Sequence, residues 1–347
     1  MKGQSLIVWP LMKDPETTPS TALVLNDDDL RERQAETLRH YRAESTFAAY
    51  RQDWSLFMKW CEPRGLDPYK ADGNMLAAYL TWLAWTPLEK TGKVRHCSTV
   101  ERACLGIAFA LRVSGKSDWP ERGKPKEVRA FLGALRRQRK AEKSLAKAAI
   151  RLPDLRRLVQ ACPDDIRGVR DRAILLLSFD GCFRESELMA LNVDDLSFEE
   201  GGLVVRVRFS KTDQEGKGMT KAVYYAADPA LCSIRAVKTW LVAAEIESGV
   251  LFRPIPSRGC IPIDRRMNRK SVCKIVKRRA ILAGFSEAEV ASFGGHSTRS
   301  GYLTEGAAMG APLSELAAQA GHRNFAQTVT YFRASTLERH TVAHRMK

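Results

Sequence analysis

The sequence has few of the features that mark secreted or metal-binding proteins. Its eight cysteines are scattered along the chain, and none belongs to a C-x-x-C pair. Zinc sites and disulfide frameworks are recognised by regular cysteine spacings of that kind. We therefore expect reduced thiols in a cytosolic protein and no structural metal.

Long apolar runs are also missing. No stretch approaches the roughly 20 apolar residues that a helix needs to cross a bilayer. The N-terminal sequence LIVWPLM is short, contains Pro10 and is followed by Asp14 and Glu16, which does not fit a secretory leader. The sequence predicts neither a membrane span nor secretion.

What the chain has in excess is positive charge. Its 347 residues include 56 Lys+Arg and 40 Asp+Glu, a formal net charge of +16. Such an excess favours a polyanionic partner such as nucleic acid, with an anionic membrane surface as the alternative. The length and a hydrophobic content of 44% are sufficient for two domains with buried cores.

Helical periodicity dominates the N-terminal part, except in residues 1–25, which we expect to form a flexible arm. After Ser45, a residue suited to cap a helix, apolar residues recur every three or four positions. They are Phe47, Tyr50, Trp54, Phe57 and Cys61. More helical stretches without a strand pattern follow, so residues 26–140 are predicted to form an all-helical domain.

Basic residues are concentrated at the end of this domain. From Lys124 to Arg157, twelve basic residues stand against three acidic ones. Such a run is either a solvated helix face or a surface that follows DNA phosphates. We expect a basic linker at 141–152. On the second interpretation, the DNA contacts include Arg136, Arg137, Arg139 and Lys140.

The second domain, predicted at 153–333, combines helices with one small sheet. Gly181 is expected to end a helix in the left-handed conformation. Further on, Val205 and Val207 alternate with Arg206 and Arg208, which is the period of a strand, and a turn and a second strand follow. The predicted fold class is mainly α, with a small antiparallel β-sheet in the second domain.

Polar residues suited to chemistry occur at several places in this domain. They are, in chain order, Arg184 with Glu187, Lys211, His296 with Arg299, and His322 nine positions before Tyr331. His296 and Arg299 are neighbours on one helical face because they are three residues apart. Taken singly, each has an ordinary explanation, such as a surface ion pair, a solvated lysine or a packing tyrosine.

Taken together, these residues resemble the tyrosine recombinase (phage integrase) superfamily, and in length and layout the Cre-like recombinases. The resemblance covers residues 27–347. It is specific in the motifs GCFRESEL, FSKTDQ, GGHSTRSG and GHRNFAQTVTYF, and rests on helical pattern alone in the N-terminal part. It implies that the two domains form a clamp around duplex DNA. One departure is Ser300, which follows Arg299 where many members have histidine.

The resemblance also implies a role for each residue. Tyr331 is the nucleophile of a covalent 3′-phosphotyrosyl intermediate, Arg184 and Arg299 bind the phosphoryl oxygens, and His322 adds a donor. The remaining roles are His296 as base, Lys211 as general acid, and Glu187 as the group that orients His296 or an arginine. Guanidinium groups match phosphoryl geometry, and a tyrosine of pKa about 10 needs a base and a positive field. No metal, ATP or other cofactor is expected.

One basic helix is the expected DNA-reading element, with eight basic residues between Asp264 and Arg279. The resemblance places its start in the major groove. Arg269 is expected to contact a base, with a phosphate contact alone as the alternative. Phosphate contacts are expected from Arg265, Arg266, Lys274 and Lys277.

Residues 334–347 form a short tail after the predicted nucleophile. By resemblance it docks onto a neighbouring protomer through Leu337, Val342 and Met346, with a solvated tail as the alternative. The predicted protein is a nucleoid-associated, cytoplasmic site-specific recombinase, dimeric on an inverted-repeat site and tetrameric in synapsis. The alternatives are a type IB topoisomerase-like nicking and closing enzyme and a catalytically silent architectural DNA-binding protein.

Overall fold

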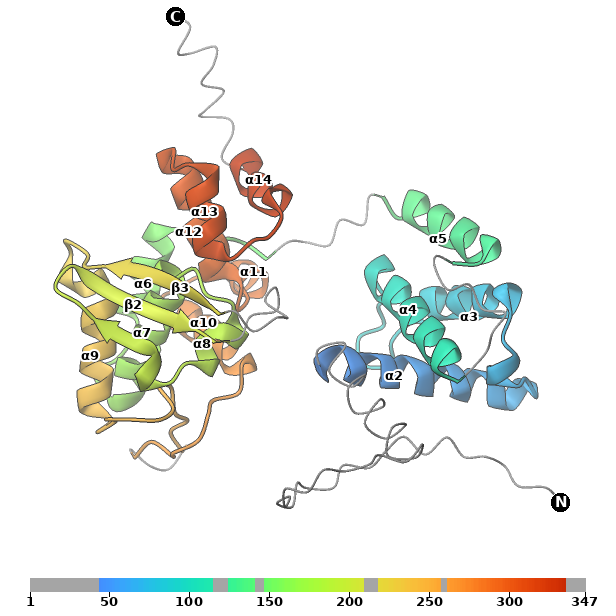
Figure 1. The fold of residues 1–347 in the computed structure, drawn as a ribbon, viewed down its shortest axis with the longest axis horizontal. Coiled ribbons are helices and arrows are strands. Elements are labelled where there is room, and N and C mark those ends of the chain that lie inside the picture. The colour runs from blue at the N-terminus through green and yellow to red at the C-terminus, as the bar shows by residue number, and fades with distance from the viewer. Residues whose placement is uncertain (1–43, 115–123, 141–146, 209–217, 257–260, 335–347) are drawn as a thin grey trace, which may run out of the picture. The chain divides into compact units, whose positions relative to one another are not determined.

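The computed structural model describes residues 44–114, 124–140, 147–208, 218–256 and 261–334 (Figure 1). The chain divides into two compact units, Met1–Ala141 and Glu142–Lys347. The expected N-terminal arm, Lys211 and the tail residues 335–347 lie outside the described residues. In the described ranges no helix is both long enough and apolar enough to span a bilayer.

The first unit is built from helices in its described part. They are α2 (Glu44–Cys61), α3 (Gly73–Trp85), α4 (Cys97–Val113) and α5 (Lys126–Gln138), with short 3₁₀ turns at Glu62–Arg64 and Pro68–Lys70. The apolar stripe predicted after Ser45 is confirmed, because Phe57 and Cys61 are fully buried and Phe47 and Tyr50 nearly so. Helix α3 begins after Asp72, whose carboxylate accepts a hydrogen bond from Met75 N at 2.7 Å.

The second unit is also mainly helical. It contains α6 (Leu152–Gln160), α7 (Ile166–Asp180), α8 (Glu185–Ala190), α9 (Ser233–Ala243), α10 (Lys270–Leu282), α11 (Glu287–Ser292), α12 (Ser297–Met309), α13 (Leu313–Ala320) and α14 (Phe325–Ala334), with 3₁₀ turns at Val193–Asp195 and Pro229–Leu231. Figure 1 shows α12, α13 and α14 grouped at one end of this unit. The fold class predicted from the sequence, mainly α with a small antiparallel sheet, is confirmed.

The sheet has three antiparallel strands in the order β1-β2-β3. They are β1 (Leu196–Phe198), β2 (Gly202–Val207) and β3 (Met219–Tyr224), and Val205 is paired with both Leu196 and Lys221. Val205 and Val207 are buried while Arg206 and Arg208 are exposed, as the sequence alternation predicts. One face of the sheet therefore covers the core.

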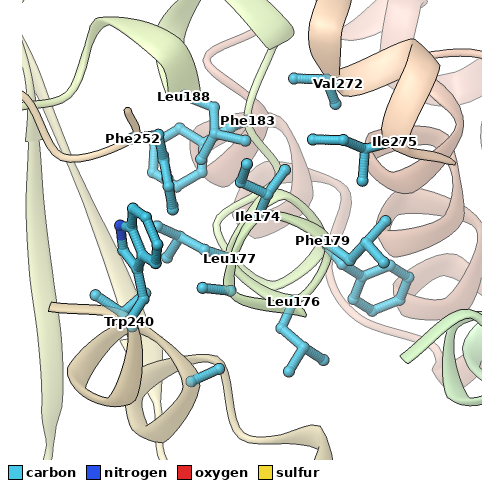
Figure 2. Close-up of a cluster of buried hydrophobic side chains, with 14 of the residues drawn as sticks. Ile174, Leu176, Leu177, Phe179, Phe183, Leu188, Trp240, Phe252, Val272 and Ile275 are labelled. Atoms are coloured by element: carbon cyan, nitrogen blue, oxygen red, sulfur yellow. The ribbon is translucent and has the colours of Figure 1, made fainter. Parts of the chain in front are cut away.

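Helix α7 lies in the middle of the core of the second unit. Figure 2 shows Leu177 pointing toward Trp240 and Phe252, while Phe179 points away on another side of the helix. All four of these side chains are at most 4% exposed. A helix that is apolar on nearly every side is stable only when other elements surround it. The turn that follows α7 is therefore attached to a helix that lies inside the core.

A buried charge cluster joins α7 to α10. The carboxylate of Asp171, which is 0% exposed, accepts hydrogen bonds from Arg170 (Nη2, 2.9 Å), Arg278 (Nη2, 2.5 Å) and Arg279 (Nη2, 2.7 Å). Arg170 and Arg279 are themselves buried. Because buried charges are tolerated only when they are paired, this cluster fixes the position of α10 on α7.

The end of the expected linker is part of the second unit. Ile150 is fully buried, and its N–H donates to Ser297 O at 2.9 Å, while Ala148 N donates to Ser292 O at 3.0 Å. Gly301 of α12 leaves room for this segment, because a Cβ atom at this position would lie 1.7 Å from Ile150 O. The segment before α6 is thus fixed beside the first turn of α12.

Candidate active site

The turn between α7 and α8 carries the first predicted catalytic residue. The left-handed conformation expected at Gly181 occurs instead at Cys182, whose φ is 48°, while Gly181 has φ −80°. Glycine is required at 181 for space, because a Cβ atom there would lie 2.0 Å from Cε2 of Phe183. A non-glycine residue with positive φ is strained unless surrounding contacts hold it.

Arg184 and Glu187 form a pair at the start of α8. The Glu187 carboxylate accepts hydrogen bonds from Arg184 N at 3.0 Å and from Arg184 Nη1 at 2.5 Å. Burial alone would raise the pKa of Glu187, but Lys221, the Arg184 N–H and the Arg184 guanidinium together hold it below its ordinary value. Of the two partners predicted for Glu187, the structure pairs it with an arginine. Arg184 also donates from Nη2 to Gly321 O at 3.3 Å.

Arg299 lies in the first turn of α12, and His296 is exposed at the N-cap of the same helix. The Arg299 side chain is buried and donates from Nη1 to Cys182 O and from Nη2 to Ala320 O, both at 2.6 Å. Arg184 and Arg299 therefore reach the consecutive carbonyl groups of Gly321 and Ala320. The structure brings these two predicted residues together from elements that lie far apart in the sequence.

His322 follows these two carbonyl groups and contacts Arg299. Its Nε2 atom lies 2.9 Å from Arg299 Nη2, and its Nδ1 atom lies 2.8 Å from Thr328 Oγ1. Burial, together with Arg299, Arg184 and Lys221, lowers the pKa of His322 to about 4. Because a guanidinium group only donates, Nε2 of the neutral ring accepts and Nδ1 carries the proton. To donate to a phosphoryl oxygen from Nε2, as predicted, His322 would need a proton on the atom that here accepts from Arg299.

Tyr331 lies on α14, nine residues after His322. Its half-buried ring packs against a small core cluster that contains Cys182, Leu303 and Ala320. Burial lowers the pKa of Arg299, and Cys182, Glu187 and Tyr331 in their ionised forms oppose this effect. The predicted nucleophile is thus in the electrostatic surroundings of Arg299.

Lys221 is a site residue that the sequence reasoning did not identify. It lies on β3, is fully buried, and places its Nζ atom 3.7 Å from Glu187 Oε2. The predicted general acid, Lys211, is outside the described residues. The sequence does contain a signal for Lys221. In a strand, Lys221 and Val223 lie on the same face, so Lys221 is a charged residue at a position where an apolar one is expected.

The basic residues of α10 and the preceding loop differ in their surroundings. Arg265, Arg269 and Lys274 are exposed, and Lys277 is half-buried. Arg266 is bound to its own chain, because its guanidinium donates to Met189 O at 2.8 Å and to Asn192 Oδ1 at 2.8 Å. The DNA contacts predicted for these residues stay predictions.

Arg139 in the first unit is placed differently from our expectation. It is 4% exposed, donates to Ala84 O and Arg95 O at 2.8 Å each, and lies over the Trp85 ring at 4.5 Å. Because these contacts bind the guanidinium group of Arg139 to its own unit, we leave Arg139 out of the proposed DNA contacts. Arg136 pairs with Glu101, while Arg137 and Lys140 are exposed.

The charges of the site favour a phosphate ligand. Arg184 and Lys221 pair with the Glu187 carboxylate, and Arg299 binds Cys182 O in the turn just before them, which leaves an excess of positive charge in a largely buried place. Fixed cationic donors of this kind stabilise the charge that develops on a phosphoryl group during transesterification. Within the described ranges, no group of His, Cys, Asp and Glu side chains is arranged to hold a metal ion.

Comparisons with known proteins identify one family. Residues 149–338 match the model of the phage integrase family. The chain is 30% identical over 336 residues to the "Integrase/recombinase xerD homolog" of Selenomonas ruminantium, which covers 96% of this chain and 95% of the relative. It is 25% identical over 307 residues to the tyrosine recombinase XerD of Vibrio cholerae, covering 85% of this chain and 87% of the relative.

The fold has solved relatives as well. A crystal structure of a λ integrase dimer bound to a COC′ core site matches with a TM-score of 0.55 at 15% identity, over 87% of this chain and 93% of that one. The chain belongs to the phage integrase family and is a tyrosine recombinase, an enzyme of DNA recombination. The superfamily resemblance read from the motifs is thereby confirmed.

Proposed function

We propose that this enzyme exchanges DNA strands at specific sites through a 3′-phosphotyrosyl intermediate on Tyr331. The observation that carries the proposal is the convergence of Arg184 and Arg299 on the adjacent carbonyls of Gly321 and Ala320, beside His322. Two guanidinium groups bound to adjacent carbonyls suit the two nonbridging oxygens of one phosphate.

The reaction consists of two transesterifications, and each of them breaks one phosphoester bond and forms another. The Tyr331 hydroxyl gives its proton to a base and attacks the scissile phosphorus, the bond to the 5′ oxygen breaks, and that oxygen receives a proton to become a hydroxyl. Attack by the 5′ hydroxyl of a partner strand then releases Tyr331. His296 is the proposed base and Lys211 the proposed acid, and Arg184 and Arg299 stabilise the charge on the phosphoryl oxygens.

The proposed assembly is a dimer on an inverted-repeat site and a tetramer when two sites are paired. The solved λ integrase relatives include a dimer on a core site and a tetramer on a Holliday junction, which supports this assembly. A cytoplasmic, nucleoid-associated location is part of the same proposal. Exposed basic residues such as Arg137, Lys140 and Arg269 are the proposed DNA contacts.

The decisive experiment traps the covalent intermediate. A library of nicked duplexes with randomised half-sites is incubated with the protein, and adducts that survive denaturation are recovered and sequenced. Tyr331→Phe is expected to give no adduct, and an adduct that persists in this variant would overturn the nucleophile assignment. Arg184→Ala is expected to reduce adduct formation by about 10² to 10³ while retaining DNA binding.

The selected duplex then separates strand exchange from simple nicking and closing. Two copies of the duplex are placed on one supercoiled plasmid, and recombinant products are scored against relaxed plasmid without recombination. Recombinants whose formation depends on Tyr331 are expected. Relaxation without recombinants would instead favour a topoisomerase-like activity.

A further inference from the structure

Lys221 lies on the buried face of β3, where an apolar residue is expected. In β3, Lys221 and Val223 are buried at 1% and 3% exposure, while Thr220, Ala222 and Tyr224 on the other face are exposed. Burial of an ammonium group is costly, and here it lowers the pKa of Lys221 to about 8. An apolar side chain would satisfy the strand at lower cost.

The Lys221 ammonium holds the turn that follows α7. Nζ donates to Gly181 O at 2.8 Å and to Cys182 O at 3.0 Å, and it lies 4.5 Å from the centroid of the Phe183 ring. All three partners belong to the turn that leads into Arg184. The opposite charge of Glu187 lies 3.7 Å away and is itself bound to Arg184.

The same turn also positions Arg299. The Cys182 carbonyl that accepts from Lys221 accepts from Arg299 Nη1 at 2.6 Å. Cys182 has φ 48°, a conformation that a residue with a Cβ atom rarely adopts unless its contacts hold it there. The direction of this carbonyl therefore depends on the groups bound to it.

We propose that Lys221 is a positioning residue for DNA cleavage, which fixes the Gly181 and Cys182 carbonyls so that Arg184 and Arg299 bind the scissile phosphate in one geometry. The proposal rests on the proposed function of this site. Lys221 acts through the two arginines, because its ammonium is enclosed by protein and is already bound to backbone oxygens.

The test uses Lys221→Met, which keeps a long unbranched side chain, one atom shorter than lysine, and removes the charge and the donors. Adduct formation is followed in single turnovers on the selected nicked duplex, at increasing duplex concentration. The rate at saturating duplex is expected to fall about 100-fold, the scale on which a small misplacement of catalytic groups acts. The duplex concentration for half-maximal rate is expected to change less than twofold. A wild-type rate at saturating duplex would overturn the proposal.

Two further variants separate positioning from general stability. Val223→Ala removes buried apolar atoms from the same face of β3, and is expected to lower the unfolding midpoint while keeping the saturating rate. Lys221→Arg keeps the charge and the N–H donors, and is expected to be faster than Lys221→Met. If Val223→Ala loses as much rate as Lys221→Met at equal stability, Lys221 has only a structural role.

If Lys221→Met does not fold, a second variant is used. Lys221→Gln then takes its place, because its polar amide suits the position but is uncharged and one atom shorter than lysine. It should no longer hold both carbonyl groups, and a rate at least tenfold below wild type is expected. A wild-type rate in Lys221→Gln would overturn the proposal. Failure of the proposed function is distinguishable, because in that case the wild-type protein itself gives no adduct that depends on Tyr331.

Discussion

Nε2 of His322 lies 2.9 Å from Nη2 of Arg299, so this imidazole accepts a hydrogen bond from a permanently charged donor. The arrangement favours the neutral ring, and the pKa of His322 is lowered from 6.5 to about 4. The folded protein therefore keeps the ring neutral at pH values at which the unfolded chain protonates it. A pH dependence of stability follows from this difference.

The first prediction concerns stability between pH 6.5 and pH 4. In this window the unfolded chain binds more protons at His322 than the folded protein does, so the contribution of this residue is present above pH 6.5 and is lost as the pH falls to about 4. The difference in unfolding free energy between wild type and His322→Gln should shrink across this window. Urea unfolding at several pH values measures it.

Titrations of carboxyl groups common to both proteins cancel in this difference. An NMR titration of the imidazole signals supplies the control, because the resonance missing in His322→Gln identifies His322. That resonance should move near pH 4 and show the Nδ1–H tautomer at neutral pH. A resonance that titrates near 6.5 would contradict the arrangement with Arg299.

The second prediction concerns Asp171, which binds three arginines from α7 and α10. Asp171→Asn leaves the buried Arg170 and Arg279 without their carboxylate, and should lower the free energy of unfolding by about 3 to 5 kcal/mol. Arg278→Ala is the matched control. Its side chain is 48% exposed, so its loss should cost about 1 kcal/mol or less. Equal losses in the two variants would show that burial does not decide the strength of this cluster.

The sequence predicts those parts of the site that depend on local spacing. Arg184 and Glu187 are three residues apart at a helix start, and His296 and Arg299 are three apart on α12, so their proximity follows from helix geometry. Contacts across long separations are not accessible in this way. Lys221 reaches carbonyls 40 and 39 residues away, and the N–H groups of Arg139 reach oxygens 44 and 55 residues away.

The error at Gly181 has a similar origin. A glycine at a helix end is typically left-handed, and the sequence offers no reason to expect otherwise. In the structure the Phe183 ring lies against Gly181, so the glycine is needed for space and the positive φ falls on Cys182. Side-chain packing over the turn, which the local sequence does not reveal, decides between the two residues.

The third prediction concerns Gly301 in α12. A Cβ atom at this position would lie 1.7 Å from Ile150 O, a backbone atom of the segment before α6. Gly301→Ala should therefore displace that segment from the first turn of α12 and lower the free energy of unfolding by about 1 to 3 kcal/mol, as overpacking does elsewhere. Gly201→Ala is the control, because no atom lies within 4 Å of a Cβ there. Thermal unfolding of both variants checks the prediction, which fails if they are equally stable.

The fourth prediction separates two neighbouring arginines of the first unit. Arg137 is exposed, whereas Arg139 donates to Ala84 O and Arg95 O from a buried position. Arg137→Ala should weaken binding to a fluorescein-labelled duplex and reduce the salt dependence of binding by about one counterion, because it removes a phosphate contact. Its stability should be unchanged.

Arg139→Ala should show the opposite pattern. Its loss leaves two carbonyl oxygens without their donor, and should lower the free energy of unfolding by about 2 kcal/mol or more. At temperatures where the variant is folded, the salt dependence of DNA binding should equal that of the wild type, since the buried guanidinium contacts no phosphate. Fluorescence anisotropy at several salt concentrations, together with urea unfolding, measures both quantities. A reduced salt dependence with unchanged stability would mean that Arg139 leaves its buried position to bind DNA.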